Sequence, residues 1–435
     1  MPMTHAVPVE ILPFLSTDGH QFECLNNDRI DRILKTVRDH LGTEIAFVSR
    51  YVDGSQKQLT HVSSDVELPM GPGFTNARED SYCWHVLEGR LPELILDPAD
   101  HPFAQTIGLT DFLPVGCHLN TPLRLSDGSI YGSFCCLSRT PNRSMTERDM
   151  GILRAFAALA AEQIEASLES EQRRSGLHDA IDGVLQGGTI QILHQPIIAL
   201  GTRQPVGVEC LARFADAQQR GPDMWFSEAA EIGMGVELEM LAVRSALNTL
   251  THVPPGFYIS INASPETILS GALRNALDGQ DADRIVIEVT EHQRVDDFPR
   301  LKQALAALAG RARIAIDDIG AGYAGLRHII DLAPSILKLD MSLTRDIDQD
   351  PARRALTSAM VRLGEEIGCK IVAEGIERNG ERDTLADLGV EYGQGYLFAV
   401  PMPVVAAQQF LLGVDRTSQQ PMPVPRGRSR RRLSA

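Results

Sequence analysis

The residues best suited to chemistry are acids and amides that directly follow short apolar runs. Asp317 and Asp318 stand where the run Ile314–Ile316 ends, and a glycine-rich segment, residues 320–325, comes next. A short apolar run bounded in this way is typical of a buried strand, and hard cations such as Mg2+ prefer carboxylate oxygens. The pair indicates a divalent-cation site, although an aspartate after a strand can equally cap the following helix.

The same pattern repeats along the second half of the chain. Polar side chains stand at or near the ends of further strand-like runs: Glu209, Asn262, Glu288, Glu291, Lys338, Asp340, Glu374 and Gln394. Two carboxylates about 4 Å apart repel by roughly 4 kcal/mol at an effective dielectric constant near 20. One lysine does not neutralise five or more acids. If these residues converge, the cluster requires metal ions.

The runs that carry these residues alternate with helix-like stretches over residues 177–413. Eight strands alternating with helices predict a TIM-like (β/α)8 barrel, in which the carboxyl ends of the strands meet at one mouth. The first strand is possibly antiparallel. The predicted strands are residues 190–193, 205–208, 257–261, 285–289, 313–316, 335–339, 370–373 and 396–400.

Residues 20–168 predict a separate α+β domain built on one antiparallel sheet. Helical spacing over Asp28–Leu41 predicts its first helix, and Asp127-Gly128 is a hairpin turn signal. A long helix begins near Thr146, the candidate N-cap. The predicted strands are residues 44–51, 58–63, 94–96, 117–123 and 130–137.

Residues 146–176 form the predicted connecting helix. Apolar residues recur at alternating spacings of three and four: Met150, Leu153, Ala157, Ala160, Ile164 and Leu168. We interpret this stripe as a parallel dimer seam that passes a signal between the domains. The alternative is a helix that packs on its own domain. Residues 414–435 predict a disordered basic tail, for which contact with anionic lipid or nucleic acid is a less favoured interpretation.

The seven cysteines include no Cys-x-x-Cys pair and are odd in number, which favours reduced thiols over a disulfide framework. The segments Cys83–His85 and Cys117-His118 are weak evidence for a metal or cofactor site, and we favour ordinary packing. Cys135 and its neighbour Cys136 point to opposite faces of a strand, so they are not expected to form a redox pair.

The bulk properties restrict the class of protein. The chain has 435 residues and a net charge of −16, which disfavours general nucleic-acid binding. No basic segment followed by an apolar stretch opens the chain, and no run approaches the ~20 apolar residues of a membrane helix. We therefore expect a soluble cytoplasmic protein without a transmembrane segment.

Two resemblances to known families add to this interpretation. Residues 20–168 resemble a GAF domain through the segments 80–84, 86–89 and 94–97 and the hairpin 123–132. Such domains bind small molecules or chromophores, or only dimerise. The resemblance implies a sensor module with an unknown small-molecule ligand, and we expect a homodimer.

Residues 177–413 closely resemble an EAL-type cyclic-di-GMP phosphodiesterase. Cys210 stands where the family usually has alanine, and Ile319 where it has phenylalanine; neither departure removes a ligand. The signature is Glu209-Cys-Leu-Ala-Arg213, and the other matching motifs are Gln195-Pro-Ile, Ser260-Ile-Asn262, Glu288-Val-Thr-Glu291, Asp317-Asp-Ile-Gly-Ala-Gly-Tyr323, Lys338-Leu-Asp340, Ala373-Glu-Gly-Ile-Glu377 and Gln394-Gly-Tyr396.

This resemblance implies hydrolysis of cyclic di-GMP to linear pGpG with two divalent ions, Mg2+ or Mn2+. It implies that Glu209, Asn262, Glu288 and Asp317 hold one ion, and that Asp317, Asp318 and Glu374 surround the other. Lys338 orients or deprotonates the attacking water or offsets charge, with help from Gln394. Gln195 and Arg213 contact the substrate, and Glu291 anchors the glycine-rich loop. The alternative functions are a non-catalytic cyclic-di-GMP effector and a dimerising scaffold.

Overall fold

The computed structural model describes residues 28–108, 113–187, 190–215, 220–290, 297–320 and 331–413. The chain divides into two compact units, residues 1–174 and 175–435, and each is described by itself. The tail, Glu291 and most of the glycine-rich segment after Asp318 lie outside the described residues.

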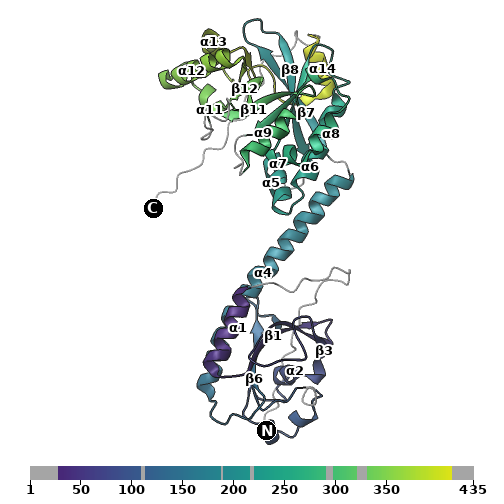
Figure 1. Ribbon diagram of the computed structural model, residues 1–435, viewed down its shortest axis with the longest axis vertical. Coiled ribbons are helices and arrows are strands. Elements are labelled where there is room, and N and C mark those ends of the chain that lie inside the picture. Colours follow the sequence, from purple (N-terminus) through teal and green to yellow (C-terminus); the bar gives the residue numbers. More distant parts are fainter. Residues whose placement is uncertain are drawn as a thin grey trace. The chain divides into compact units, whose positions relative to one another are not determined.

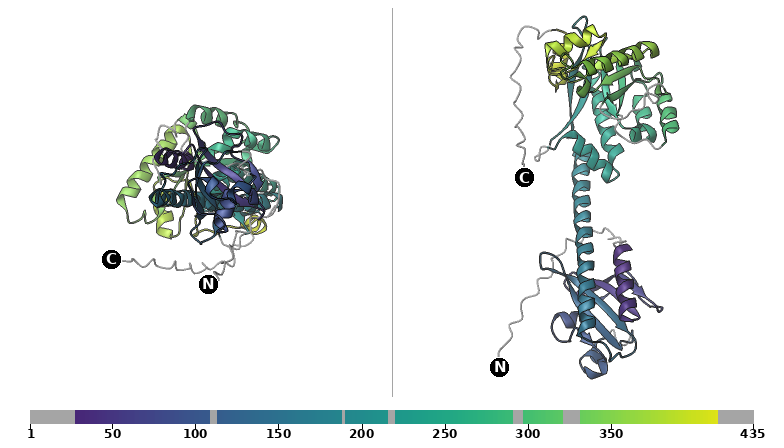
Figure 2. Two further views of the ribbon diagram at one scale, coloured as in Figure 1. Left: turned by 90° about the horizontal axis from the view of Figure 1, so that it is seen from below. Right: turned by 90° about the vertical axis from the view of Figure 1, so that its left-hand side faces the viewer.

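A six-stranded antiparallel sheet of order β3-β2-β1-β6-β5-β4 forms the first unit (Figure 1). Helix α1 (Asp28–Leu41) and the first part of α4 (Glu147–Gly187) pack on the sheet, as Figure 2 shows. The short helix α2 (Tyr82–Leu87) carries Cys83 into a second apolar cluster that includes Cys135. The strands are β1 (Ile45–Val52), β2 (Gln56–Ser64), β3 (Thr75–Ala77), β4 (Leu94–Ile95), β5 (Cys117–Arg124) and β6 (Ile130–Ser138). The predicted α+β fold is confirmed; strand β3 was not predicted.

Helix α4 differs from the predicted connector in two respects. Its apolar stripe from Met150 to Ile164 is buried against its own sheet, so the alternative to a dimer seam holds for these residues. The helix also continues through Gly176 and Gly183 to Gly187, although each internal glycine costs about 1 kcal/mol relative to alanine. Neither α4 nor any other helix of the described residues is long and apolar enough to cross a membrane.

The second unit is a closed eight-stranded barrel. Strands β8 to β14 are parallel, and β7 closes the barrel by pairing antiparallel with both β8 and β14. The predicted barrel with an antiparallel first strand is therefore confirmed. The strands are β7 (Ile190–Ala199), β8 (Pro205–Phe214), β9 (Tyr258–Ala263), β10 (Ile285–Thr290), β11 (Arg313–Ile319), β12 (Ile336–Leu339), β13 (Lys370–Ala373) and β14 (Tyr392–Gly393).

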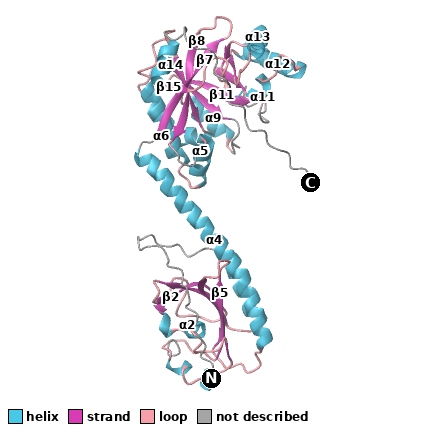
Figure 3. Ribbon diagram, turned by 180° about the vertical axis from the view of Figure 1, so that it is seen from behind, coloured by secondary structure: helices cyan, strands magenta, loops and turns pink. Residues whose placement is uncertain are grey.

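Helices surround these strands, as Figure 3 shows. They bury the outward-facing residues of the strands, such as Ile259 and Ile287 on one side and Leu337 and Ile371 on the other. The described helices are α5 (Pro222–Glu231), α6 (Gly235–Thr249), α7 (Pro265–Ser270), α8 (Ala272–Leu277), α9 (Phe298–Ala306), α11 (Met341–Thr344), α12 (Pro351–Ile367), α13 (Asn379–Asp387) and α14 (Val404–Leu411).

The barrel interior consists of an apolar layer followed by a polar one. The apolar layer is one cluster: Ile197, Tyr258, Val286, Ala315, Ile336 and Val372. Residues two apart on a strand face the same side. The next inward residue toward the mouth is therefore polar on every one of these strands: Gln195, Ser260, Glu288, Asp317, Lys338 and Glu374. On β7 the order is reversed, because that strand runs antiparallel.

The predicted last strand at residues 396–400 is wrong. These residues form a turn in which the amides of Phe398 and Ala399 donate to the carbonyl of Gly395. The parallel strand is instead β14, and Met402–Pro403 (β15) pairs antiparallel with β7. An apolar run in the sequence looks like a strand whether or not its backbone amides can pair with a neighbouring strand. Here the amide of Leu397 donates to the carbonyl of Ile376 instead.

Gly395 offers a test of this packing, because a Cβ there would lie 2.2 Å from the carbonyl oxygen of Ile376. We expect Gly395→Ala to destabilise the second unit by about 1–3 kcal/mol. Chemical unfolding followed by Trp225 fluorescence, in a Trp84→Phe background that leaves one tryptophan, measures this change. Gly201→Ala is the control, because nothing lies within 4 Å of its added Cβ. Equal midpoints for the two variants would contradict the close packing.

Candidate active site

A single buried lysine lies at the centre of the polar layer. Lys338 on β12 is 1% exposed, and its Nζ faces four carboxylates that come from four other strands or strand ends. The distances are 2.6 Å to Glu374 Oε1, 2.7 Å to Glu288 Oε2, 3.2 Å to Asp317 Oδ1 and 3.7 Å to Glu209 Oε1. Residues up to 165 positions apart in the sequence thus meet at one ammonium group.

The register of the parallel strands produces this meeting. Glu209 is paired with Ser260, and Glu288 lies opposite Asn262 on one side and Ala315 on the other. Because neighbouring strands are in lateral register, their inward side chains reach the mouth at similar heights. The hydroxyl of Ser260 donates to Glu288 and fixes the carboxylate that Lys338 also contacts.

Amide side chains hold Glu209. Gln394, just after β14, donates from Nε2 to Glu209 Oε2 at 2.5 Å and to Gln195 Oε1 at 2.9 Å. Asn262 Nδ2 donates to Glu209 Oε1 at 3.1 Å. Gln195 in turn donates to the carbonyl of Ala399 at 3.1 Å. Within the described part of the chain, the buried Oε1 of Gln394 has no hydrogen-bond partner, so it is an acceptor left for a water or ligand.

A second group of oxygens lies beside this one. One carboxylate oxygen from each of Asp317, Asp318 and Glu374 lies within 4.8 Å of the others, a spacing that suits a metal ion. Asp318 has a φ of +59°, and its amide donates to Asp317 Oδ1 at 2.9 Å. A non-glycine residue in this conformation costs about 1–3 kcal/mol. Such strain is typical of functional sites, since the surrounding structure must hold it.

The pKa values follow from burial and crowding. Burial raises the pKa of Glu288 well above its ordinary value, and burial with repulsion from Asp317 and Glu209 raises that of Glu374 to about 8. Burial also acts on Glu209, but Lys338 and the hydrogen bonds from Gln394 and Asn262 prevail, and its pKa is lowered. Burial acts against the charge of Lys338, yet the four carboxylates raise its pKa well above the ordinary value.

These shifts mean that the cluster lacks positive charge. One ammonium faces four carboxylates, and two of the four have pKa values raised toward the neutral form. Divalent cations would supply the missing charge, and the donors are the carboxylate and amide oxygens that Mg2+ and Mn2+ prefer. The residues present therefore fit hard divalent ions.

The structure brings together nine of the residues singled out in the sequence. Arg213 and Asp340 lie outside this group, and the predicted roles of Arg213 and Glu291 stay predictions. Arg213 donates from Nη1 to the carbonyl of Ala212 at 2.7 Å, and this bond leads away from the carboxylates. Asp340 caps α11 by accepting from the amide of Ser342. Glu291 lies outside the described residues. Ser260 was given no role, although its place two residues before Asn262 on one strand face was a usable signal.

Family comparisons follow the same division of the chain. Residues 177–401, just over half of its length, match the family model of the EAL domain. The chain belongs to the EAL domain family. Residues 27–164 match the model of the GAF domain. The order of a GAF domain followed by an EAL domain, which the sequence resemblances implied, is thereby confirmed.

Two curated proteins illustrate the sequence similarity of this chain to relatives. "Probable cyclic di-GMP phosphodiesterase PdeD" of Escherichia coli is 29% identical over 234 residues, covering 51% of this chain and 43% of that protein. "Cyclic di-GMP phosphodiesterase PA2567" of Pseudomonas aeruginosa is 32% identical over 232 residues, covering 48% and 38%. This chain therefore spans less than half the length of these curated relatives.

The fold is also similar to a solved structure of the EAL enzyme Bd1971 in a form with cAMP and cyclic di-GMP bound. The match covers 85% of this chain and 93% of the Bd1971 chain. Its TM-score is 0.52 at 18% identity, which is a likeness of fold alone.

Replacing the central lysine tests the charge balance of the EAL domain. We expect Lys338→Met to destabilise this domain of the metal-free protein by about 3–5 kcal/mol, because four carboxylates, three of them buried, lose their cation. Lys370→Met is the matched control: that lysine begins the neighbouring strand and pairs with Glu391, but is solvent-exposed. Its effect should stay within about 0.5 kcal/mol. The free energy of unfolding is measured by chemical unfolding followed by Trp225 fluorescence. Similar losses of stability in both variants would refute a special role for Lys338.

The raised pKa of Glu374 predicts that the stability of the EAL domain depends on pH. In the folded metal-free protein the carboxyl group of Glu374 keeps its proton up to about pH 8. In the unfolded chain it releases that proton near the ordinary glutamate pKa of about 4.3. Stability from this group is thus present at low pH and is lost as the pH rises through about 8. We expect chelator-treated protein to lose stability between about pH 5 and pH 8, and saturating Mn2+ to remove that slope. A flat profile in chelator would contradict the raised pKa.

Proposed function

We propose that this protein hydrolyses cyclic di-GMP to linear pGpG with the help of two divalent ions, Mg2+ or Mn2+. The observation that carries the proposal is Lys338, buried among Glu209, Glu288, Asp317 and Glu374 at the mouth of an EAL domain. The names of the relatives supply the substrate class. The intact set of oxygen donors favours catalysis over binding alone.

The donors divide into two sets. Glu209, Asn262, Glu288 and Asp317 would hold one ion, and Asp317, Asp318 and Glu374 would surround the other. When bound, such ions lower the pKa of a coordinated water and neutralise charge on the phosphate. The spacing of Asp317, Asp318 and Glu374 oxygens supports the second set, and the bond between Asn262 and Glu209 supports the first.

The remaining residues orient the reaction. Lys338 acts as an ammonium donor, because the four carboxylates raise its pKa and disfavour a role as a base. It orients water and offsets the negative charge that develops on the phosphate. Gln394 fixes Glu209, and its unpaired Oε1 is an acceptor for the attacking water. Gln195 and Arg213 contact the substrate, and Glu291 anchors the glycine-rich loop.

The direct test is the conversion of cyclic di-GMP by the purified full chain with Mn2+, followed by chromatography of the nucleotides. We expect pGpG to form, to vanish on chelation and to return with added Mn2+. Glu209→Gln should lower the rate at least about 100-fold, because loss of even an indirect metal-site partner commonly costs 10–100-fold. Lys370→Met serves as the control, because that side chain is exposed and pairs with Glu391.

Three outcomes would decide against this proposal. Wild-type protein that binds cyclic di-GMP without forming pGpG would be a non-catalytic effector. Undiminished turnover by Glu209→Gln would show that the described cluster is not the reacting site. A scaffold role would be favoured if the wild type neither bound nor cleaved the nucleotide.

A further inference from the structure

The GAF domain contains a second convergence of ligating side chains. Cys83 on α2, His118 on β5 and Cys135 on β6 each offer a donor atom within 4.8 Å of the other two. The two sulfurs are 3.1 Å apart, and all three residues are at most 2% exposed. The register explains the meeting: Cys135 lies opposite Asn120, and His118 is two residues away on the same face of β5.

These donors are not fully used by the protein itself. Cys83 and Cys135 are free thiols, and Cys135 donates to Asn120 Oδ1 at 3.1 Å. The buried Nδ1 of His118 has no hydrogen-bond partner among the residues described. The pKa of Cys83 is lowered well below its ordinary value, chiefly by the hydrogen bond with Cys135 and then by Lys57 and His118. Two buried thiols beside an imidazole whose Nδ1 has no partner form an arrangement that binds a soft metal ion.

Lys57 determines the charge that such an ion should carry. Its Nζ lies 3.4 Å from Cys83 Sγ, and the residue is 5% exposed. In the described ranges no carboxylate pairs with it, and its Nζ also lies 4.9 Å from the centre of the Phe47 ring. Two thiolates and one ammonium sum to one negative charge. A monovalent cation makes this buried group neutral, whereas a divalent one leaves an uncompensated positive charge, which is costly to bury.

We propose that the GAF domain binds one Cu(I) ion through the thiolates of Cys83 and Cys135 and the imidazole of His118. Cu(I) is monovalent, prefers sulfur and imidazole ligands, and accepts three donors without a fourth. Lys57 donates to the Cys83 thiolate and completes the charge balance. No oxidation or reduction is involved: the two thiols release their protons as the Cu–S bonds form.

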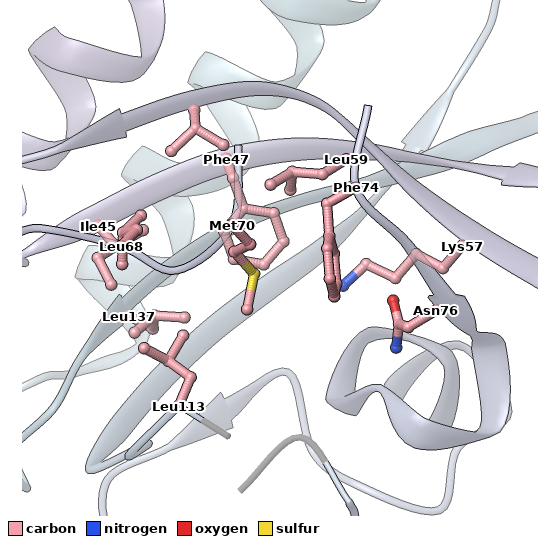
Figure 4. A pocket seen from close by; sticks show the side chains of 11 residues that line it. Ile45, Phe47, Lys57, Leu59, Leu68, Met70, Phe74, Asn76, Leu113 and Leu137 are labelled. Carbon is pink, nitrogen blue, oxygen red and sulfur yellow. The ribbon is translucent and has the colours of Figure 1, made fainter. Parts of the chain in front are cut away.

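Lys57 also lines a cavity of the GAF domain. This small, mostly apolar cavity of about 30 Å3 lies on the same side of the sheet. Figure 4 shows Lys57 extending beside Phe74 and Asn76, with the sulfur of Met70 among the side chains that line the cavity. The thioether of Met70 therefore lines the same cavity as Lys57, which contacts Cys83.

The test is an anaerobic titration of the full chain with Cu(I), in competition with a coloured Cu(I) chelator. We expect the wild type to retain one equivalent, and Cys83→Ser and Cys135→Ser to release it. Cys136→Ser is the matched control, because Cys136 is the next residue on β6, equally buried, but lies in the cluster on the opposite face. X-ray absorption at the copper edge should show sulfur and nitrogen neighbours.

Failure of the wild type to retain copper would overturn the proposal, as would equal loss from Cys83→Ser and Cys136→Ser. The short distance between the two sulfurs has one competing explanation, which is a pair that forms a disulfide. Thiol counting after exposure to hydrogen peroxide, with no copper present, detects it. If this pair oxidises and the protein does not retain Cu(I), the cluster is a disulfide-forming pair and not a metal site.

The charge argument is tested separately, in a variant that keeps all three ligands. Lys57→Gln removes the positive charge, so the preference for Cu(I) over Zn2+ should shift toward Zn2+ by at least about tenfold. The comparison uses the affinities of one variant for the two ions, so a modest change in stability does not affect the result. An unchanged preference would refute the role of Lys57 and with it the choice of a monovalent ion.

Discussion

The attraction between one buried ammonium and four carboxylates is the interaction on which the second domain depends. Lys338 lies within 4 Å of acids contributed by β8, β10, β11 and the end of β13. None of these charges is stable alone in an interior, and removing one member of such a group leaves the others uncompensated. The positions of the strand ends are therefore coupled electrostatically as well as by backbone hydrogen bonds.

This coupling restricts the register of every strand. A slip by one residue would turn the inward side chains outward. Glu288 would then face the apolar cluster that Ile285, Ile287 and Val289 form with the surrounding helices. Val286, two residues before Glu288, belongs to the interior apolar layer that closes the barrel beneath the site. Packing and chemistry thus specify the same register.

Parallel strands explain why most of the site was predictable. Their carboxyl ends share an edge, so a polar residue after each apolar run is enough to predict convergence. Features that depend on tertiary contacts could not be predicted from the sequence. The run 396–400 is as apolar as a strand, but its amides bond to Gly395 and Ile376. The stripe on α4 has the spacing of a dimer seam, and only the position of its own sheet shows that it is already covered.

The thiol cluster was missed for a related reason. In an antiparallel sheet, which residues face each other depends on register, and neighbours such as Cys117 and His118 diverge to opposite faces. Cys135 and His118 meet diagonally across β5 and β6, and Cys83 arrives from α2.

The two clusters also differ in the charge that they leave unbalanced. With its carboxylates ionised, the oxygen cluster around Lys338 has a large excess of negative charge, which calls for hard divalent ions. The sulfur cluster beside Lys57 sums to one negative charge, which a single soft monovalent ion neutralises. In both domains a buried lysine, by the number of anions that surround it, determines which cation its neighbours can accept.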